Sequence, residues 1–385
     1  MGPLEGIRVV DFTAAMAGPM CTMLLADFGA KVIKIEPPDG DYGRRWGQTR
    51  FGPMSDQSGL FVAMNRNKAS VVADLKDAAD KELVHSLMAE ADVVVENFKP
   101  GVADRLGVGY SAARQLNASV IYCSISGFGQ TGPLRESPGL DMLMQAFVGH
   151  MSVTGEPGRP SVRIGPSPID LLAGTNGALG IMMALFERQR SGRGQHIDTS
   201  LYEASIEMVS HFIADYTGGG PLQGKSGQYF AFSSPYGIFN ASDREFYVGA
   251  AHQRGFTTLC AEIGRPELTD DPKFRTNSDR IRNRQELHEI LFPVFRAKTA
   301  EEWVRRFTEL GIPASLVMGL DEVVEQPQAA EREMIVSAGV GTVRSAGIPI
   351  KLSETPGSRG RAAPYLGADN DFIRAHRWDF SSLPG

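Results

Sequence analysis

The alternation of strand-like and helix-like segments between residues 7 and 126 most constrains the fold of this chain. Short β-rich runs cover residues 7–12, 31–36, 92–98 and 118–126, and helical patterns separate them. Parallel strands need crossover connections of this kind, and such crossovers are right-handed. The alternation therefore predicts an α/β fold whose open, mostly parallel sheet binds ligands at the carboxyl ends of its strands.

The length of 385 residues suggests more than one domain. We predict a large domain from residues 1–200 and 330–385, joined to a smaller α/β domain over residues 234–329. Residues 201–233 form a linker helix and loop, and the glycines at 218–220 within it could serve as a hinge.

Composition excludes several classes of protein. A net charge of -6, without a basic stripe, argues against a nucleic-acid partner. The start lacks a signal-peptide pattern, and glycines and polar residues interrupt the most apolar helical stretch, so we predict no membrane association. Three distant cysteines are typical of a reduced, cytoplasmic protein, and neither they nor the histidines have metal-ligand spacing.

Asp170 is the strongest single candidate for catalysis. Pro168 stops a helix from continuing through it, so the sequence predicts that a helix begins near Ile169 and Asp170. Gly174 and Gly177 would leave the helix face beside the acid bare, so that a bulky ligand could lie there. A carboxylate in such a slot can attack an activated acyl group, although the pattern alone equally describes an N-terminal helix cap.

Basic and aromatic residues recur where the predicted strands end. Lys76 and Arg105 could meet the phosphates of a ligand, although each could also be an ordinary surface charge. Asn97 and Phe98 follow a strand directly and would suit a purine ring or the edge of a core. The first predicted β-α-β unit, residues 7–36, lacks G-x-G-x-x-G, and the chain has no G-x-S-x-G motif, so we predict neither a dinucleotide site there nor a serine hydrolase.

The order of motifs resembles the class III CoA-transferases, the CaiB/BaiF family that includes formyl-CoA transferase. The resemblance covers the whole chain and rests on GIRVVDF, AGP, LADFGAKVIKIEPPDGD, NRNK, VENFKPG, SISGFGQTGP, the D-x-x-AG that begins at Asp170, RQRSGRGQHIDTSLYEA and PYGIF. It implies a large Rossmann-like domain, a smaller domain and a homodimer of interlocked subunits. It also implies an enzyme that moves CoA from an acyl-CoA donor to a carboxylic acid, without a tightly bound cofactor.

The resemblance also assigns roles to residues. Asp170 falls on the family's catalytic aspartate, which forms a mixed anhydride and then an aspartyl-CoA thioester. Helix N–H groups would lower its pKa and keep it ionised. CoA contacts fall on residues matched one by one, with Lys76 and Arg105 at phosphates: Met16, Ala73, Lys76, Asn97, Phe98 and Arg105.

Four departures from formyl-CoA transferase bear on the substrate. Met16 replaces a glutamine, Leu140 a tyrosine and Pro37 an arginine, and the glycine loop over the site has no match in SGQYFAF. The apolar Met16 and Leu140 predict an acyl group that is larger or less polar than oxalate. An α-methylacyl-CoA racemase is the main alternative, but its catalytic histidine is Leu140 here, which cannot move a proton. A CoA-binding protein without turnover is the third possibility.

Overall fold

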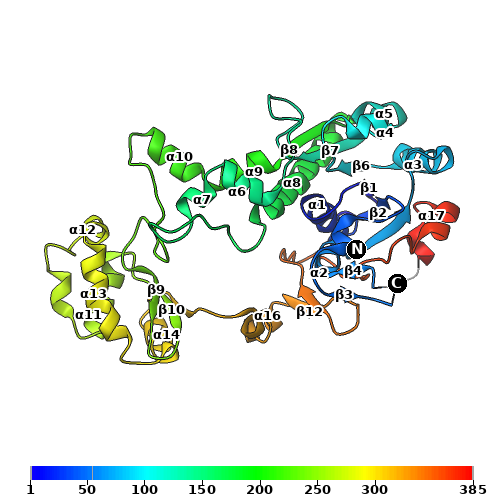
Figure 1. Ribbon diagram of the computed structural model, residues 1–385. Helices are drawn as coiled ribbons and strands as arrows, with labels where there is room; N and C mark the ends of the chain where they lie inside the picture. Colours follow the sequence, from blue (N-terminus) through cyan, green and yellow to red (C-terminus); the bar gives the residue numbers. More distant parts are fainter. Residues whose placement is uncertain (1, 54, 384–385) are drawn as a thin grey trace. The chain divides into compact units, whose positions relative to one another are not determined.

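The structure is a computed structural model that describes residues 2–53 and 55–383, and its chain forms two compact units (Figure 1). The first unit comprises the chain up to Val148, Ile164–Asp215 and the part from Pro327 onward. The second comprises Gly149–Arg163 and Tyr216–Gln326. The domain boundaries from the sequence stay a prediction, since compact units are not shown to fold independently.

A six-stranded, entirely parallel sheet lies at the centre of the first unit, which confirms the predicted α/β fold class. Numbered along the chain, its strands lie in the Rossmann order 3-2-1-4-5-6. In spatial order they are β5 (Lys68–Val72), β2 (Lys31–Glu36), β1 (Arg8–Asp11), β6 (Val93–Glu96), β7 (Ile121–Ser126) and β8 (His196–Ser200). The strand order reverses at β1, so the adjoining crevice at the carboxyl ends is the expected place for a ligand.

Helices cover both faces of this sheet (Figure 1). Alternate strand residues point to opposite faces, so Val9, Val95 and Cys123 pack beneath α1 (Ala17–Asp27) and α8 (Pro168–Ser191). Their neighbours Val10 and Val94 pack on the other face beneath α3 (Ala78–Glu90), α5 (Tyr110–Leu116) and α17 (Asn370–His376). Strands buried on both faces must be apolar almost throughout, which explains their valine and isoleucine content.

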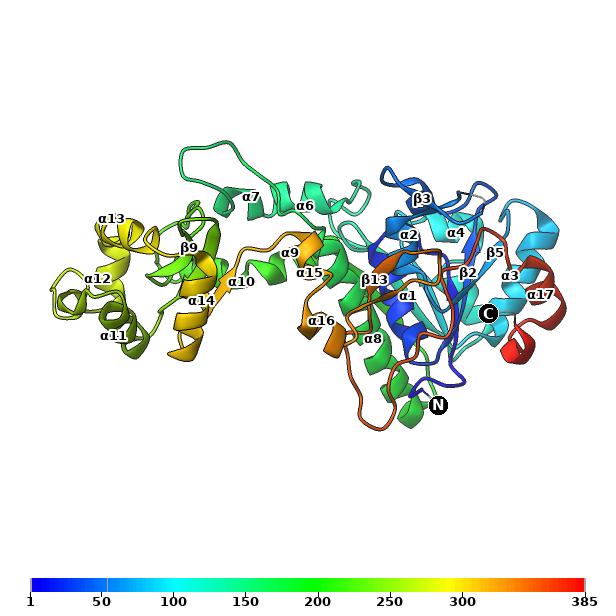
Figure 2. The ribbon, with the colours of Figure 1, turned by 90° about the horizontal axis from the view of Figure 1, so that it is seen from below.

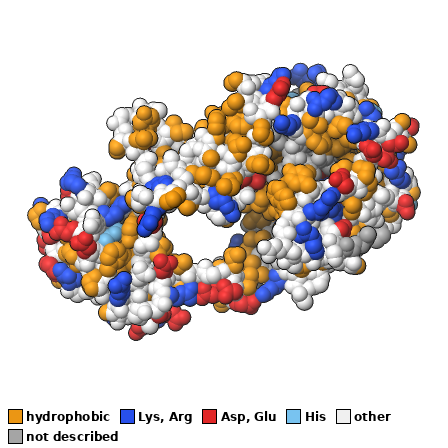
Figure 3. All heavy atoms as spheres, in the orientation of Figure 1, with side chains coloured by type: hydrophobic (Ala, Val, Ile, Leu, Met, Phe, Trp, Pro, Cys, Tyr) orange, Lys and Arg blue, Asp and Glu red, His pale blue; other side chains and the backbone are white. Residues whose placement is uncertain are grey.

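Helix α8 is the one helix among the described residues that is long and apolar enough to span a membrane. Its Ile169, Ala173, Ile181 and Leu185 belong to the core of the first unit, as expected for a core helix. The opposite face is apolar but exposed, and apolar side chains gather on the surface around α6, α8 and α9 (Figure 3).

The C-terminal segment covers the edge of the sheet at β5, beside which α17 lies (Figure 2). Asp369 accepts a hydrogen bond from the Ser70 backbone N–H at 2.8 Å, and Asn370 accepts one from Val72 at 2.8 Å. These side chains satisfy donors that an edge strand would otherwise expose, which prevents pairing with another strand.

The second unit is built on an antiparallel sheet in the order β11 (Ala314–Leu316), β10 (Glu245–Gly249), β9 (Tyr236–Asn240). An aromatic core that includes Phe239, Phe295, Trp303 and Phe307 joins this sheet to its helices. Those helices are α11 (Gln253–Glu262), α12 (Asn277–Arg282), α13 (Arg284–Phe295) and α14 (Ala300–Glu309).

Short elements connect these parts. They are β3 (Arg50–Phe51), β4 (Gln57–Ser58), α2 (Gly59–Met64), α4 (Val102–Leu106), α6 (Asp141–Phe147), α7 (His150–Val153), α9 (Leu201–Met208), α10 (Ser210–Thr217), α15 (Leu320–Val323), α16 (Pro327–Glu331), β12 (Ile335–Ser337), β13 (Arg344–Ala346) and the 3-10 helices η1 (Tyr42–Arg45), η2 (Pro266–Thr269) and η3 (Phe380–Ser382).

Candidate active site

Asp170 lies in the first turn of α8, where the sequence predicts it, but another acid caps this helix. Ser167 at the N-cap makes no side-chain capping bond. Instead, the carboxylate of Asp141 on α6 accepts hydrogen bonds from the backbone N–H groups of Ile169 at 2.9 Å and Asp170 at 3.3 Å. Asp141 therefore satisfies the exposed donors of α8 and leaves the carboxylate of Asp170 available.

Gln145 fixes the orientation of Asp141. It lies one helical turn further along α6, and its Nε2 donates to Oδ1 of Asp141 at 2.5 Å. Its Oε1 accepts from the Ile164 N–H at 2.8 Å, so both ends of the amide are used. Gln145 is fully buried and Asp141 nearly so, and the pair ties α6 to the chain that enters α8.

The pKa of Asp170 is raised to about 7, whereas the sequence predicted a lowered pKa. Burial disfavours the ionised carboxylate, and the negative charge of Asp141 adds to the effect. The prediction was wrong because the helix N–H groups that would stabilise Asp170 bind Asp141 instead. Among the described residues, no cation forms an ion pair with Asp170. The acid is therefore poised to gain or lose a proton near neutral pH.

The glycines of α8 do not leave space for a ligand, contrary to the prediction. A Cβ at Gly174 would lie 2.3 Å from the carbonyl oxygen of Ala17, and one at Gly177 would lie 2.8 Å from the Ile125 side chain. Both glycines instead let α1 and the sheet approach the α8 backbone closely. This packing places the beginning of α1 one helical turn from Asp170.

Tyr42 is a residue of this site that sequence reasoning missed. It begins η1, and its pKa is raised, first by burial and then by the negative charges of Asp41 and Asp170. Its ring contacts Trp46 edge to face, with the centroids 5.4 Å apart. The phenol therefore lies within electrostatic range of Asp170.

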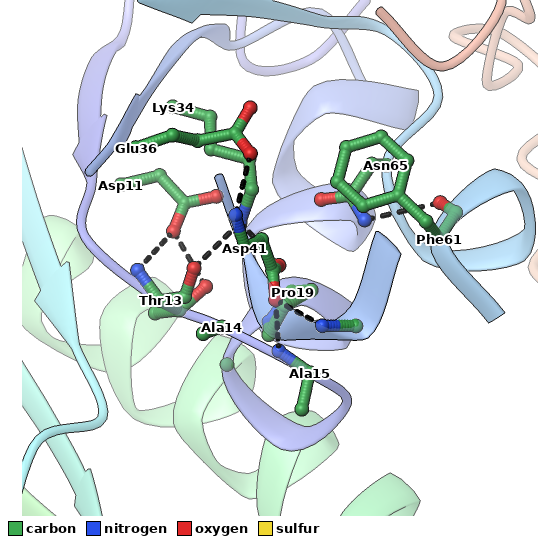
Figure 4. Close-up of polar contacts among 12 residues, drawn as sticks. Asp11, Thr13, Ala14, Ala15, Pro19, Lys34, Glu36, Asp41, Phe61 and Asn65 are labelled. Atoms are coloured by element: carbon green, nitrogen blue, oxygen red, sulfur yellow. Dashed lines mark hydrogen bonds and ion pairs between the residues drawn. The ribbon is translucent and has the colours of Figure 1, made fainter. Parts of the chain in front are cut away.

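A buried network of charges joins the loop before α1 to the start of η1 (Figure 4). Lys34 reaches from β2 to the Asp41 carboxylate at 3.0 Å and donates to the Thr13 carbonyl at 2.5 Å. Asp41 in turn accepts from the N–H groups of Ala15 at 3.0 Å and Gly43 at 2.7 Å. These bonds hold Ala15 in a left-handed conformation with φ 63°, which is costly for a residue with a side chain.

Asp11 and Lys68 extend the network to neighbouring strands. Their charged groups lie 3.1 Å apart, and Asp11 also accepts from the hydroxyl of Thr22 at 2.7 Å. Burial alone would raise the pKa of Asp11, but Lys68 and Lys34 together hold it below its ordinary value. The network is therefore a fully paired scaffold that fixes the loop before α1.

A cavity of about 420 Å³ lies at the carboxyl ends of β1, β2, β5 and β6, where the strand order reverses. It brings together three residues that the sequence predicts for CoA binding, namely Ala73, Lys76 and Phe98. Phe12 and Leu75 contribute further apolar surface, and Pro37 and Pro38 belong to the same lining. Three acids, Glu36, Asp39 and Asp74, also line it, beside the single cation. Its apolar part suits a flat heterocycle, and Lys76 suits a phosphate attached to that ring.

Asn97 lies beside this cavity but uses its side chain internally. Its Oδ1 accepts from the Ala14 N–H and its Nδ2 donates to the Ala14 carbonyl, both at 2.9 Å. This pair joins the turn after β6 to the loop before α1. Asn97 therefore positions the backbone, which the sequence did not indicate.

The other two predicted contacts, Arg105 and Met16, do not line the cavity. Arg105 lies on α4, next to the cavity residue Leu106, and is exposed. Within residues 2–53 and 55–383, neither Lys76 nor Arg105 forms an ion pair, so both charges are available to an anion. Met16 occupies the N-cap of α1, at the end of the site near Gly174.

The arrangement pairs a cavity for a nucleotide-like group with an unpaired, proton-exchanging carboxylate. In the part of the chain that the structure describes, no group of three or more His, Cys, Asp or Glu residues could hold a metal ion. Such a site can perform covalent acyl chemistry with a carboxylate as the nucleophile. The fold and site thus define an α/β enzyme that handles activated acyl groups.

Comparison with known proteins specifies the class. The model of CoA-transferase family III matches residues 4–370, and the chain belongs to this family. It is 37% identical over 354 residues to acetyl-CoA:oxalate CoA-transferase of Acetobacter aceti, with 91% of this chain and 90% of the relative covered. It is 34% identical to human succinyl-CoA:glutarate CoA-transferase, with 96% of this chain and 85% of the relative covered.

A solved structure of a CAIB/BAIF family protein from Brucella suis has the same fold. Its TM-score is 0.88 at 34% sequence identity, and the match covers 97% of this chain and 99% of that one. The predicted family is therefore confirmed, and the protein is a family III CoA-transferase that acts on acyl-CoA.

Proposed function

We propose that Asp170 carries CoA transfer in this enzyme as the covalent nucleophile. The observation that supports this most is the position of Asp170 in the first turn of α8, half-buried and without a cationic partner among the described residues. Ionised, it is a poorly solvated and hence reactive carboxylate. Asp141 and Gln145 position the start of its helix, and Tyr42, whose pKa Asp170 raises, would supply a phenolic O–H to a developing oxyanion.

The reaction conserves the thioester bond in four steps. An oxygen of Asp170 attacks the donor thioester carbonyl, the C–S bond breaks, and a mixed anhydride and CoA thiolate form. The thiolate attacks the Asp170 carbonyl carbon, which frees the donor acid and leaves an aspartyl-CoA thioester. The acceptor carboxylate then attacks this thioester and releases the thiolate, which finally attacks the acceptor acyl carbonyl and restores Asp170.

The cavity between β1, β2, β5 and β6 is the proposed binding site for the adenosine end of CoA. Phe98 and Ala73 would contact the base, and Lys76 and Arg105 would bind the phosphates through charge-assisted hydrogen bonds. Asn97 would hold the turn, and Met16 would contact the chain near the thioester. CoA is a substrate here, and the site needs no tightly bound cofactor.

We propose succinyl-CoA as the donor and a short dicarboxylic acid larger than oxalate as the acceptor. The names of two relatives support this, succinyl-CoA:glutarate CoA-transferase and succinyl-CoA--D-citramalate CoA-transferase of Chloroflexus aurantiacus, the latter 36% identical to this chain. The apolar Met16 and Leu140 favour the longer hydrocarbon chains of such acids.

The exposed apolar face of α8 supports a homodimer, which we propose to be interlocked. It includes Leu179, Met183 and Phe186, which are 52%, 62% and 64% exposed. Apolar surface of this extent is typical of a face that another subunit covers. The three cysteines are unpaired and buried, which favours a reducing compartment, and we propose the cytoplasm.

Trapping of the covalent intermediate tests this function. Wild-type protein mixed with succinyl-CoA should gain an adduct by intact-mass spectrometry, and hydroxylamine should convert Asp170 to its hydroxamate. Asp170→Asn should gain no adduct and should lose at least about a thousand-fold in kcat. Asp371→Asn is a matched control, since Asp371 also lies in the first turn of a helix but is exposed.

Two other outcomes would overturn the proposal. An adduct on another residue would remove Asp170 from its role. Deuterium incorporation at the α-carbon of a branched acyl-CoA in heavy water, without transfer to any acid, would assign racemase chemistry instead. Leu140 makes that outcome unexpected, because its side chain is 56% exposed and has no titratable group.

A further inference from the structure

A second buried acid, Glu96, lies beside the CoA cavity and has no part in the transfer steps. It is the last residue of β6, is 4% exposed, and immediately precedes Asn97 and Phe98. Its Oε2 accepts a hydrogen bond from the Phe98 backbone N–H at 2.7 Å. The carboxyl group therefore fixes the turn that presents the Phe98 ring to the cavity and the Asn97 amide to Ala14.

A row of polar side chains connects Glu96 to the edge of the sheet. Ser124 is the register partner of Glu96 on β7, and its hydroxyl lowers the pKa of the Glu96 carboxyl group by favouring the ionised form. The same hydroxyl lies 3.0 Å from Nε2 of His196 on β8, the edge strand. His196 is exposed, and its ring stacks on Tyr110 with the centroids 4.9 Å apart.

The hydroxyl of Ser124 has one proton, so the direction of this chain depends on Glu96. When Glu96 is ionised, Ser124 donates to it and accepts from Nε2–H of His196. When Glu96 is protonated, its O–H donates to Ser124, and Ser124 donates to the lone pair of His196. Each state satisfies all three groups, so a proton can pass between solvent and Glu96 without leaving an unpaired polar group.

The surroundings make Glu96 titrate near neutral pH. Burial raises its pKa to about 7, and the negative charges of Asp104 on α4 and Asp198 on β8 act in the same direction. The Ser124 hydroxyl and the Phe98 N–H lower the pKa, but burial outweighs them. Burial lowers the pKa of His196, although Asp198 and Asp104 oppose this. Tyr122 faces Glu96 from β7 but donates to the Val108 carbonyl at 3.0 Å, and its raised pKa keeps it neutral.

We propose that Glu96 is a positioning residue for the CoA-binding turn and exchanges protons with solvent through Ser124 and His196, so that CoA affinity increases when Glu96 is ionised. This rests on the proposed binding of CoA at Phe98. An ionised carboxylate forms a stronger bond to the Phe98 N–H than a neutral carboxyl does. The charge on Glu96 therefore orders Asn97 and Phe98, and through Ala14 the loop before α1.

Calorimetric titration of free CoA into the full-length protein, from about pH 5.5 to about pH 8.5, tests this. Glu96→Gln keeps an acceptor for Phe98 and a donor for Ser124, so it imitates the protonated state. The ratio of its Kd to that of the wild type should be near one at the acidic end and about five at the alkaline end. The ratio cancels the titration of the CoA phosphates, which affects both proteins equally.

Ser124→Ala gives a second measurement that does not depend on the folding of Glu96→Gln. It removes a bond that favours the ionised carboxylate, so the pH at which Kd changes should move upward by about half a unit or more. Dephospho-CoA should reproduce both results, because it lacks the 3′-phosphate that titrates near the same pH.

Phe98→Ala separates this inference from the proposed CoA site. It should weaken CoA binding at every pH. If it does, and the Kd ratio for Glu96→Gln stays constant across the pH range, the charge on Glu96 does not control CoA affinity, while the proposed CoA site stands. If Phe98→Ala leaves Kd unchanged, CoA binds elsewhere and both proposals fail.

Discussion

Two sets of carboxylates in the first unit, all buried except the half-buried Asp170, have opposite electrostatic properties. Asp11 forms an ion pair with Lys68, and Asp41 forms one with Lys34. Lys68 and Lys34 hold the pKa of Asp11 low against the effect of burial, and Lys34 does the same for Asp41. Asp170 and Glu96 have no cationic partner within the described part of the chain, and burial raises the pKa of each to about 7. The pairing of charges, and not burial itself, separates the two sets.

The difference in pKa indicates the role of each set of carboxylates. A paired carboxylate keeps its charge across the physiological range and can serve as a permanent tether for backbone N–H groups, as Asp41 does for Ala15 and Gly43. An unpaired one changes its charge near neutral pH and can act as a nucleophile or respond to protons. The scaffold and the reactive groups are therefore built from the same residue type in different surroundings.

Removal of the shared cation should have the largest effect on this contrast. Lys34→Met leaves Asp41 buried without its ion-pair partner and leaves Asp11 with Lys68 alone, which should lower the free energy of unfolding by about 3–5 kcal/mol. The pKa values of both acids should rise in the folded state. The loss should therefore be largest at alkaline pH and shrink as the pH falls and the acids take up protons.

Urea unfolding followed by circular dichroism at about pH 5 and about pH 8 measures this loss. Lys351→Met is the control, because Lys351 is exposed and the substitution should change stability by less than about 0.5 kcal/mol. Equal losses at the two pH values would mean that the network acts through packing and not through charge.

Neutralising Asp141 should bring the pKa of Asp170 closer to the low values of the paired set. Asp141→Asn removes the negative charge that adds to the raised pKa of Asp170, so the acidic limb of the kcat profile should move downward by about one pH unit, worth about 1.4 kcal/mol. The amide still accepts from the Ile169 N–H, although its own N–H₂ group opposes Nε2 of Gln145, so kcat above about pH 8 should fall several-fold.

Steady-state rates with saturating acyl-CoA across pH give this limb directly. Gln145→Glu is a useful companion, since it adds a negative charge beside Asp141 and should move the limb upward. If Asp141→Asn lowers kcat without moving the limb, Asp141 acts on Asp170 only through the geometry of the helix start.

Much of the fold could be predicted from the sequence because buried strands and crossover helices leave a local pattern. The runs that become β1, β2, β6 and β7 are apolar and short, and the structure places them in one parallel sheet. The position of Asp170 at a helix start followed in the same way from Pro168. These features depend on residues that are close together in the sequence, so a local sequence pattern indicates them.

The environment of Asp170 could not be predicted, because it depends on contacts between distant segments. Asp141 lies 29 residues before Asp170, and nothing local shows that it captures the α8 N–H groups. The spacing of Asp141 and Gln145 at one helical turn was the available signal for that pair. The prediction of ligand space beside Gly174 was wrong for the same reason. A bare helix face can receive a ligand or another helix, and here α1 occupies it.

The smallest predicted effect concerns a charge that belongs to neither set. Lys76 lines the cavity proposed for CoA, is exposed and has no ion-pair partner among the described residues, so its role would be to bind phosphate. Lys76→Ala should raise KM for acyl-CoA about five-fold, close to 1 kcal/mol, without changing the kcat profile that Asp170 governs. The difference in KM between the wild type and Lys76→Ala should shrink as salt is added, because an exposed charge pair is screened.

Lys351→Ala is the control: it removes an exposed lysine in the C-terminal segment and should leave KM unchanged. A fall in kcat for Lys76→Ala would show instead that this end of the cavity aligns the thioester with Asp170, so that nucleotide binding and chemistry are not separable.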